Sequence, residues 1–142
     1  MASELRVNTL KDASGNNSVA TSVIYEGTNK AWAIIDTNTA TTATTDAMNV
    51  SSTTDNSLGD FTLAWSTSMN STPYAFSNGV YNNGGDAYVR AIHVRGTGIS
   101  ETTPAGMTTS NCRFVSAYAS SSASAGNGYQ AYSCINIQGD LA

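Results

Sequence analysis

Residues 49–75 read NVSSTTDNSLGDFTLAWSTSMNSTPYA, and this stretch carries the clearest strand pattern in the chain. Within it Phe61, Leu63 and Trp65 alternate with small or polar residues. A period of two is typical of a strand with one face in a core, because successive side chains of a strand point to opposite sides. We place a turn at Asp55–Asp60, before the alternation, and a break at Pro73, which has no amide hydrogen for a sheet ladder. The stretch predicts paired β-strands with the three large side chains buried.

Upstream of this stretch, two further runs indicate strands. Val19–Tyr25 is rich in β-branched residues and Ala31–Ile35 is apolar, and the segment between them has the length and glycine of a hairpin connection. We therefore expect these two runs to pair. Thr37–Thr45 consists almost wholly of Thr, Ala and Asn, which indicates either an edge strand or an extended loop.

Downstream, strand patterns alternate with polar loops. The predicted strands are Tyr74–Val80, Ala87–Arg95, Cys112–Ala119 and Tyr129–Gln138. The second of these has apolar residues on both faces, which fits either a strand covered by a partner subunit or a central sandwich strand. With about eight short strands and no amphipathic helix, the chain predicts an all-β fold, either an antiparallel β-sandwich or a jelly-roll-like domain.

The N-terminal residues indicate an appendage. Glu4–Leu10 alternates like an extended arm, and Lys11–Ser18 is rich in residues that favour turns. The length of 142 residues allows one compact core. We therefore divide the chain into an N-terminal attachment arm, residues 1–18, and a β-sandwich domain, residues 19–142.

The composition favours self-association and disfavours several other partners. Only 11% of the residues are charged and the net charge is -4, so repulsion between copies is weak and we expect a homo-oligomer. The absence of a basic run argues against nucleic-acid binding, and no apolar run approaches the roughly 20 residues of a membrane span. The N-terminus lacks the layout of a signal peptide, so we expect synthesis in a cytoplasm.

The sequence offers little that predicts catalysis or a cofactor. His93 lies in the middle of a predicted strand without a neighbouring metal ligand, and we interpret it as structural. Paired carboxylates of a glycosidase would have to come from the aspartates Asp36, Asp46, Asp55, Asp60 and Asp86. Several of these occupy turn-like segments in which aspartate caps its own backbone. We therefore predict no catalytic residue, no metal and no cofactor.

The two cysteines, Cys112 and Cys134, admit two interpretations. Free cysteines are usually small buried apolar residues, which is the simpler reading. They also flank a loop near Ala123, and a hairpin of that register would place them opposite each other at a distance compatible with a disulfide. A reducing compartment of synthesis opposes the bonded alternative.

Tyrosines at loop margins are candidates for a sugar-stacking surface, because aromatic rings bind the apolar faces of sugars and the hydroxyl groups add hydrogen bonds. Tyrosine in a strand more often serves packing. The residues that we select as candidate receptor contacts are Tyr81, Asn82, Asn83 and Tyr129.

Several short motifs in the first half of the chain carry a resemblance. They are Ala31-Trp32-Ala33, Asn49-Val50-Ser51-Ser52, Thr54-Asp55-Asn56, Gly59-Asp60-Phe61-Thr62, Met69 and Tyr74-Ala75. Together they resemble a recurring domain of tail-fibre-like proteins of marine and freshwater tailed bacteriophages, and Ser3–Leu10 is similar to the N-terminal arm of such fibres. The chain departs from those proteins at Asp36–Asp46, which lacks their glycine-bearing turn, and no motif matches from Gly84 onward.

This resemblance implies a virion structural protein, a tail fibre or fibre-like subunit. It implies a homotrimer whose arm docks on other virion proteins and whose far end contacts the host surface. A capsid decoration or head-fibre protein remains an alternative, and so does a carbohydrate-binding module that holds a host glycan. A hydrolase of surface polysaccharide would require an acidic cluster.

Overall fold

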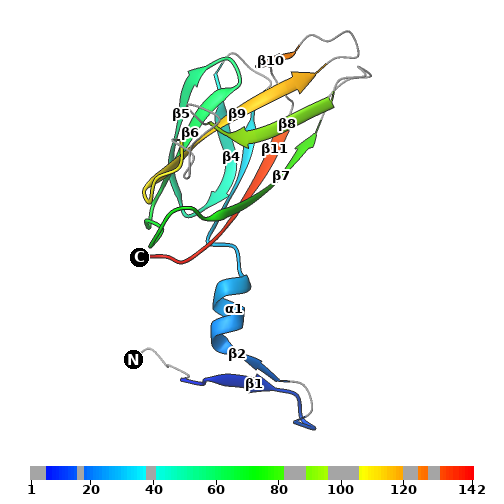
Figure 1. The fold of residues 1–142 in the computed structure, drawn as a ribbon, viewed down its shortest axis with the longest axis vertical. Coiled ribbons are helices and arrows are strands. Elements are labelled where there is room, and N and C mark those ends of the chain that lie inside the picture. The colour runs from blue at the N-terminus through cyan, green and yellow to red at the C-terminus, as the bar shows by residue number, and fades with distance from the viewer. Residues whose placement is uncertain are drawn as a thin grey trace.

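The computed structural model describes residues 6–15, 18–37, 41–81, 89–95, 106–119, 125–127 and 132–142. Two antiparallel sheets pack face to face, and a short helix and hairpin extend from one end (Figure 1). The prediction of an all-β, sandwich-like fold is therefore confirmed.

The sheet built around β3, called the β3 sheet below, has the strand order β4-β3-β11-β7. In that order its strands are Ala43–Met48, Ala31–Asp36, Tyr132–Gln138 and Ala75–Tyr81. All three neighbouring pairs are antiparallel, and β3 is paired on both of its edges.

The opposing sheet, called the β6 sheet, has β5, β6 and β9 in that order. These strands are Val50–Ser57, Asp60–Trp65 and Asn111–Ala119. On its remaining edge β9 pairs with β8, Val89–Val94, and beyond the end of β6 it pairs with the short strand β10, Ala125–Asn127.

The core lies between the two sheets and contains the alternating residues of the opening stretch. Phe61, Leu63 and Trp65 are almost fully buried, as predicted. The ring of Phe61 stacks on Phe114 with centroids 5.8 Å apart, and Phe76 of the opposite sheet meets Phe114 edge-on at 5.7 Å. Burial of large apolar and aromatic side chains from both sheets therefore holds the sandwich closed.

The prediction of a strand at Val19–Tyr25 is wrong. This segment contains β2, Ser18–Ala20, and the helix α1, Thr21–Gly27, and β2 pairs with β1, Thr9–Lys11. The expected hairpin with β3 has no place because β4 and β11 already occupy both edges of β3. The strands of the two packed sheets begin at Ala31, later than the predicted domain boundary at residue 18.

Two smaller predictions are refined. The Thr-rich segment leads into β4, which is an edge strand of the β3 sheet. The turn expected at Asp55–Asp60 is shorter, because β5 continues to Ser57 and pairs with β6 up to Asp60. Gly59 has a φ of 67°, a left-handed conformation that glycine adopts without steric cost, so the hairpin turns there.

Candidate functional site

Asn49 joins three segments of the chain just before β5. Its Nδ2 donates hydrogen bonds to the carbonyl oxygens of Lys30 and Thr67, each at 3.0 Å, and its Oδ1 accepts from the Thr67 amide at 2.7 Å. Its backbone is left-handed, with a φ of 56°. The first residue of the Asn-Val-Ser-Ser motif thus ties the segment that follows β6 to the residue before β3.

Asp60, at the start of β6, is a fully buried carboxylate held by two arginines. Arg113 donates from Nε to Oδ1 at 2.7 Å and from Nη2 to Oδ2 at 2.8 Å, and Arg95 donates from Nη1 to Oδ2 at 2.5 Å. Asn56 adds a bond of 3.2 Å to Oδ1. Burial alone would raise the pKa of Asp60, but the hydrogen bonds and positive charge of these partners lower the pKa below its ordinary value.

Sequence reasoning missed this cluster. The sequence did contain a hint of it. Charged residues are rare in this chain, yet Asp60 lies beside a predicted strand, and Arg95 and Arg113 lie in two later predicted strands. The register supplies what the sequence does not: Asp60 lies opposite Val115, and Arg113 lies opposite Thr62 on the same two strands.

A second polar cluster lies inside the core. The hydroxyl of Tyr74 accepts a hydrogen bond from Trp65 Nε1 at 3.2 Å and lies 3.2 and 3.1 Å from the carbonyl oxygens of Thr108 and Asn111. Burial raises the pKa of this hydroxyl well above its ordinary value. Since these contacts tie Tyr74 to β6 and to the segment that leads into β9, we interpret the cluster as structural.

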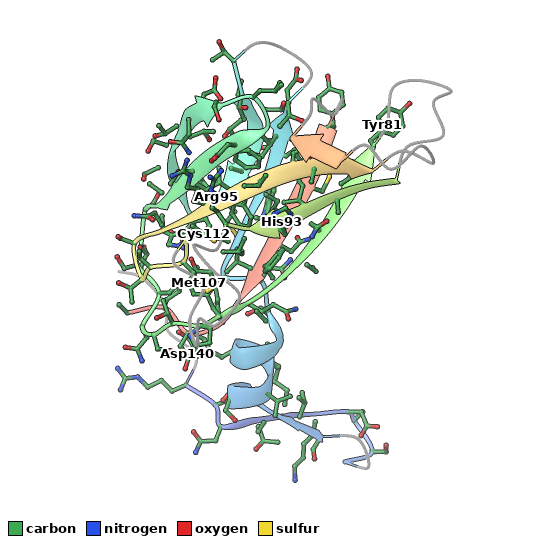
Figure 2. All side chains as sticks on the ribbon, turned by 45° about the horizontal axis from the view of Figure 1, so that its top comes forward. Tyr81, His93, Arg95, Met107, Cys112 and Asp140 are labelled. Carbon is green, nitrogen blue, oxygen red and sulfur yellow. The ribbon has the colours of Figure 1, made fainter. Side chains whose placement is uncertain are left out.

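The candidate receptor contacts are only partly described by the structure. Tyr81 is 64% exposed, at the end of the sandwich away from α1, whereas Asp140 lies next to α1 (Figure 2). Asn82, Asn83 and Tyr129 lie outside the described residues. The structure adds Tyr132, which is exposed and lies directly opposite Tyr81 on the neighbouring strand β11.

These two tyrosines belong to the outer face of the β3 sheet. Along β11 the buried residues Ser133, Ile135 and Ile137 face the core, so Tyr132 and Cys134 face outward. Cys134 lies opposite Gly79 of β7, where an added Cβ atom would meet no atom within 4 Å. This end of the face combines two aromatic rings with open space beside them.

The cysteines are free and lie in different sheets. Cys112 is buried in β9, as the simpler reading predicts, and burial raises the pKa of its thiol to about 12. Cys134 is exposed, which contradicts that reading for this residue. The hairpin that would have placed the two opposite each other is wrong, because β11 pairs with β3 and β7 instead of β9.

The described acidic residues and His93 do not form a metal-binding cluster. Within the described ranges, no group of three His, Cys, Asp or Glu side chains is placed to hold a metal ion. Asp46 accepts a hydrogen bond from the amide of Ala47, and Asp55 accepts one from Thr42, the residue before β4. Asp86 is outside the described residues.

In the part of the chain that is described, no helix has the length and apolar character needed to cross a membrane.

A groove of about 250 Å³ lies where the free edges of β4 and β5 meet. Its lining consists of Thr42, Ala43, Thr44, Val50, Ser51, Ser52 and Thr53. These side chains offer hydroxyl groups but no acid, base or charged group, so we assign no chemistry to the groove.

The stalk, defined here as residues 6–27 where described, exposes several large apolar side chains. It projects from the base of the sandwich (Figure 1). Its large exposed apolar side chains are Val7, Leu10, Val23, Ile24 and Tyr25. Helix α1 has no side-chain N-cap bond, no acidic residue in its first turn and no basic residue in its last turn. The stalk therefore has little local stabilisation of its own.

Comparison with protein-family models, with curated protein sequences and with solved structures returned no match.

Proposed function

We propose that this chain is a self-assembling structural subunit of a tailed-phage virion, a tail fibre or fibre-like protein that acts without catalysis. The observation that carries the proposal is the apolar stalk. Val23 is 57% exposed and Tyr25 46% exposed on a helix of only seven residues. The fibre-like motifs around Asn49 and Asp60 support the same role.

Association would supply the stability that the stalk lacks. Isolated helices shorter than about 12 residues and lone two-stranded hairpins are marginal in water. Packing copies of α1 and its neighbouring hairpin together would bury the exposed apolar side chains and stabilise both elements. Because the chain carries little charge, repulsion between copies opposes this packing only weakly. We propose a homotrimer that is attached to other virion proteins through the N-terminal arm, residues 1–18.

The test is the oligomeric state of the full chain. Light scattering or sedimentation of the wild type should give a trimer at micromolar concentration. Val23→Glu keeps helix propensity but places a charge on the apolar surface, so it should shift the protein to monomer. Leu58→Glu is the matched control, because Leu58 is 46% exposed on the sandwich, and it should leave the trimer intact. A monomeric wild type would count decisively against the proposal.

The same subunit on the head, as a decoration or head-fibre protein, is the alternative location. Antibody labelling of virions or a virion reconstruction would distinguish the two: density at the tail supports the fibre, and density at the capsid supports the alternative.

A second candidate function is glycan binding by the Tyr81–Tyr132 pair. Exposed aromatic side chains that lie directly opposite each other on neighbouring strands offer a stacking surface for a sugar ring. Binding on a glycan array that is lost in Tyr81→Ala and Tyr132→Ala but kept in Leu58→Ala would support it. If the array shows no binding, the glycan-binding function is contradicted and only the structural role remains.

A further inference from the structure

Two of the six cationic residues in this acidic chain meet at one carboxylate. Oδ2 of Asp60 accepts from both Arg95 and Arg113, while Oδ1 accepts from Arg113 and Asn56. The two guanidinium groups are therefore held against the same carboxylate, which is fully buried. Among the described residues, one negative charge faces two positive charges here, so the cluster carries an excess positive charge.

The outer sides of both guanidinium groups are accessible. The side chains of Arg95 and Arg113 are 44% and 41% exposed. Among the described residues, Nε and Nη2 of Arg95 and Nη1 of Arg113 have no hydrogen-bond acceptor. An anion on the solvent side would accept these donors and reduce the repulsion between the two cations.

The backbone fixes this arrangement before any ligand arrives. The amide of Arg95 donates to the carbonyl of Arg113 at 2.9 Å, and the amide of Gly106 donates to the carbonyl of Arg95 at 2.8 Å. A Cβ atom on residue 106 would lie 2.5 Å from that carbonyl oxygen, so only glycine permits the close approach. Because the two arginines are already ordered, an anion would bind them at little cost in side-chain entropy.

Two polar side chains lie on strands next to the arginine pair. His93, on β8, is exposed two residues before Arg95 and lies opposite Val115, the residue that also faces Asp60 (Figure 2). Thr62 lies opposite Arg113 and its hydroxyl accepts from Asn56 at 2.9 Å. A nucleic acid would need several such contacts along its backbone, which one cationic point in a chain of net charge -4 does not provide.

We propose that Arg95 and Arg113 form a binding site for the carboxylate or sulfate groups of an acidic polysaccharide. This inference rests on the proposed role as a virion fibre, because the far end of such a fibre would meet a host surface on which acidic polysaccharides present repeating anions. An oligomer presents the site several times, so weak single contacts add up to useful avidity on a repeating polymer.

The test uses the full chain, three polysaccharides of defined chemistry and, as a polyanion that is not a carbohydrate, polyglutamate. Polygalacturonate offers carboxylates, dextran sulfate offers sulfates, and unmodified dextran offers neither. Calorimetry or biolayer interferometry should show binding to at least one of the charged polymers and none to dextran. Binding that weakens as salt is raised would agree with an ionic contact.

Substitutions test whether Arg95 and Arg113 bind the polymer. Arg95→Gln removes one guanidinium while Arg113 still holds Asp60 through two bonds, so the fold should persist, and affinity should fall about tenfold or more. Arg95→Lys keeps the positive charge but lacks the planar N–H donors of the guanidinium group, so it should give an intermediate affinity. Arg6→Gln is the matched control, since it removes the same charge from the stalk and should leave affinity unchanged.

Three results would overturn the inference. They are no binding to either charged polymer, equal loss in Arg95→Gln and Arg6→Gln, and binding to polyglutamate in preference to both polysaccharides. Light scattering on the same samples keeps the two proposals separate: a monomeric wild type that binds dextran sulfate through Arg95 contradicts the fibre, whereas a trimer that binds neither polymer contradicts only this site.

Discussion

Asn49 combines a left-handed backbone with three side-chain hydrogen bonds, so two substitutions separate the two effects. Asn49→Gly accepts the backbone but loses the bonds, and should lower the free energy of unfolding by about 1–2 kcal/mol. Asn49→Ala should cost about 1 kcal/mol more, because its Cβ disfavours the left-handed region. Urea denaturation of both variants provides the measurement, and equal costs would show that the backbone conformation contributes nothing.

Cys112 and Cys134 should differ in reactivity. Burial excludes reagents from Cys112 and raises the pKa of its thiol to about 12, whereas Cys134 is exposed. One thiol per native chain should react with a maleimide at neutral pH, and two after unfolding. Cys134→Ser should abolish the native reaction. Two fast thiols in the native wild type would contradict the buried position of Cys112, and none before reduction would indicate a disulfide.

Asp60 should make the protein sensitive to acid. Its pKa in the folded chain lies below the ordinary value of 3.8, so the unfolded chain takes up this proton first as the pH falls. The stabilisation is complete above the ordinary value and is lost as the pH drops through the folded pKa.

Urea midpoints measured from pH 6 down to pH 2 should show this loss. Asp60→Asn should be less stable at neutral pH by about 3 kcal/mol, since two arginines lose their carboxylate, and its profile should be flatter in acid. A wild type and variant with parallel acid profiles would show that other carboxylates cause the loss.

At the scale of elements, Lys30 connects α1 to the sandwich. Its amino group donates to the carbonyl of Tyr25 and, at 3.1 Å, to the hydroxyl of Thr28, and it lies 3.5 Å from the centroid of the Tyr25 ring. Its own amide donates to Ile137 of β11 at 2.8 Å. One residue thus stabilises the last turn of the helix and the first strand of the core.

Removing this amino group should loosen α1 alone. In Lys30→Met the apolar stem stays, and amide hydrogen exchange in Thr21–Gly27 should accelerate about tenfold while the sandwich strands keep their protection. Lys11→Met, on the hairpin, is the control and should leave α1 unchanged. Unchanged exchange in Lys30→Met would mean that other contacts hold the helix.

The elements also show where sequence patterns succeed. The alternation at Phe61, Leu63 and Trp65 predicted a strand and its buried face correctly, because that pattern depends only on local geometry. The segment at Val19–Tyr25 has β-branched residues, but from Thr21 onward it is helical, and its expected partner β3 is already paired on both edges. Which strands pair depends on the whole sheet and cannot be predicted from the propensity of the local residues.

For the whole molecule, composition and strand count predicted the all-β sandwich, but the functional surfaces emerged only from the pairing. Tyr81 was selected from the sequence, whereas Tyr132 became its neighbour through the register of β7 with β11. Asp60, Arg95 and Arg113 are far apart in the sequence and meet because β6, β8 and β9 lie side by side.

The same architecture separates two tasks. The stalk, with its exposed apolar side chains, is at one end, and the Tyr81–Tyr132 pair is at the other (Figures 1 and 2). An assembly that buried the stalks would therefore leave the opposite ends of the sandwiches free for contact with another surface.

Cys134 gives the molecule a natural attachment point for a probe. It is exposed on the outer face of the β3 sheet, and Gly79 opposite leaves room beside it, while the other cysteine of the chain is buried. A maleimide-linked gold cluster should mark each subunit once without any engineered residue. Counting gold particles in electron micrographs would then give the copy number of the protein in an assembled particle.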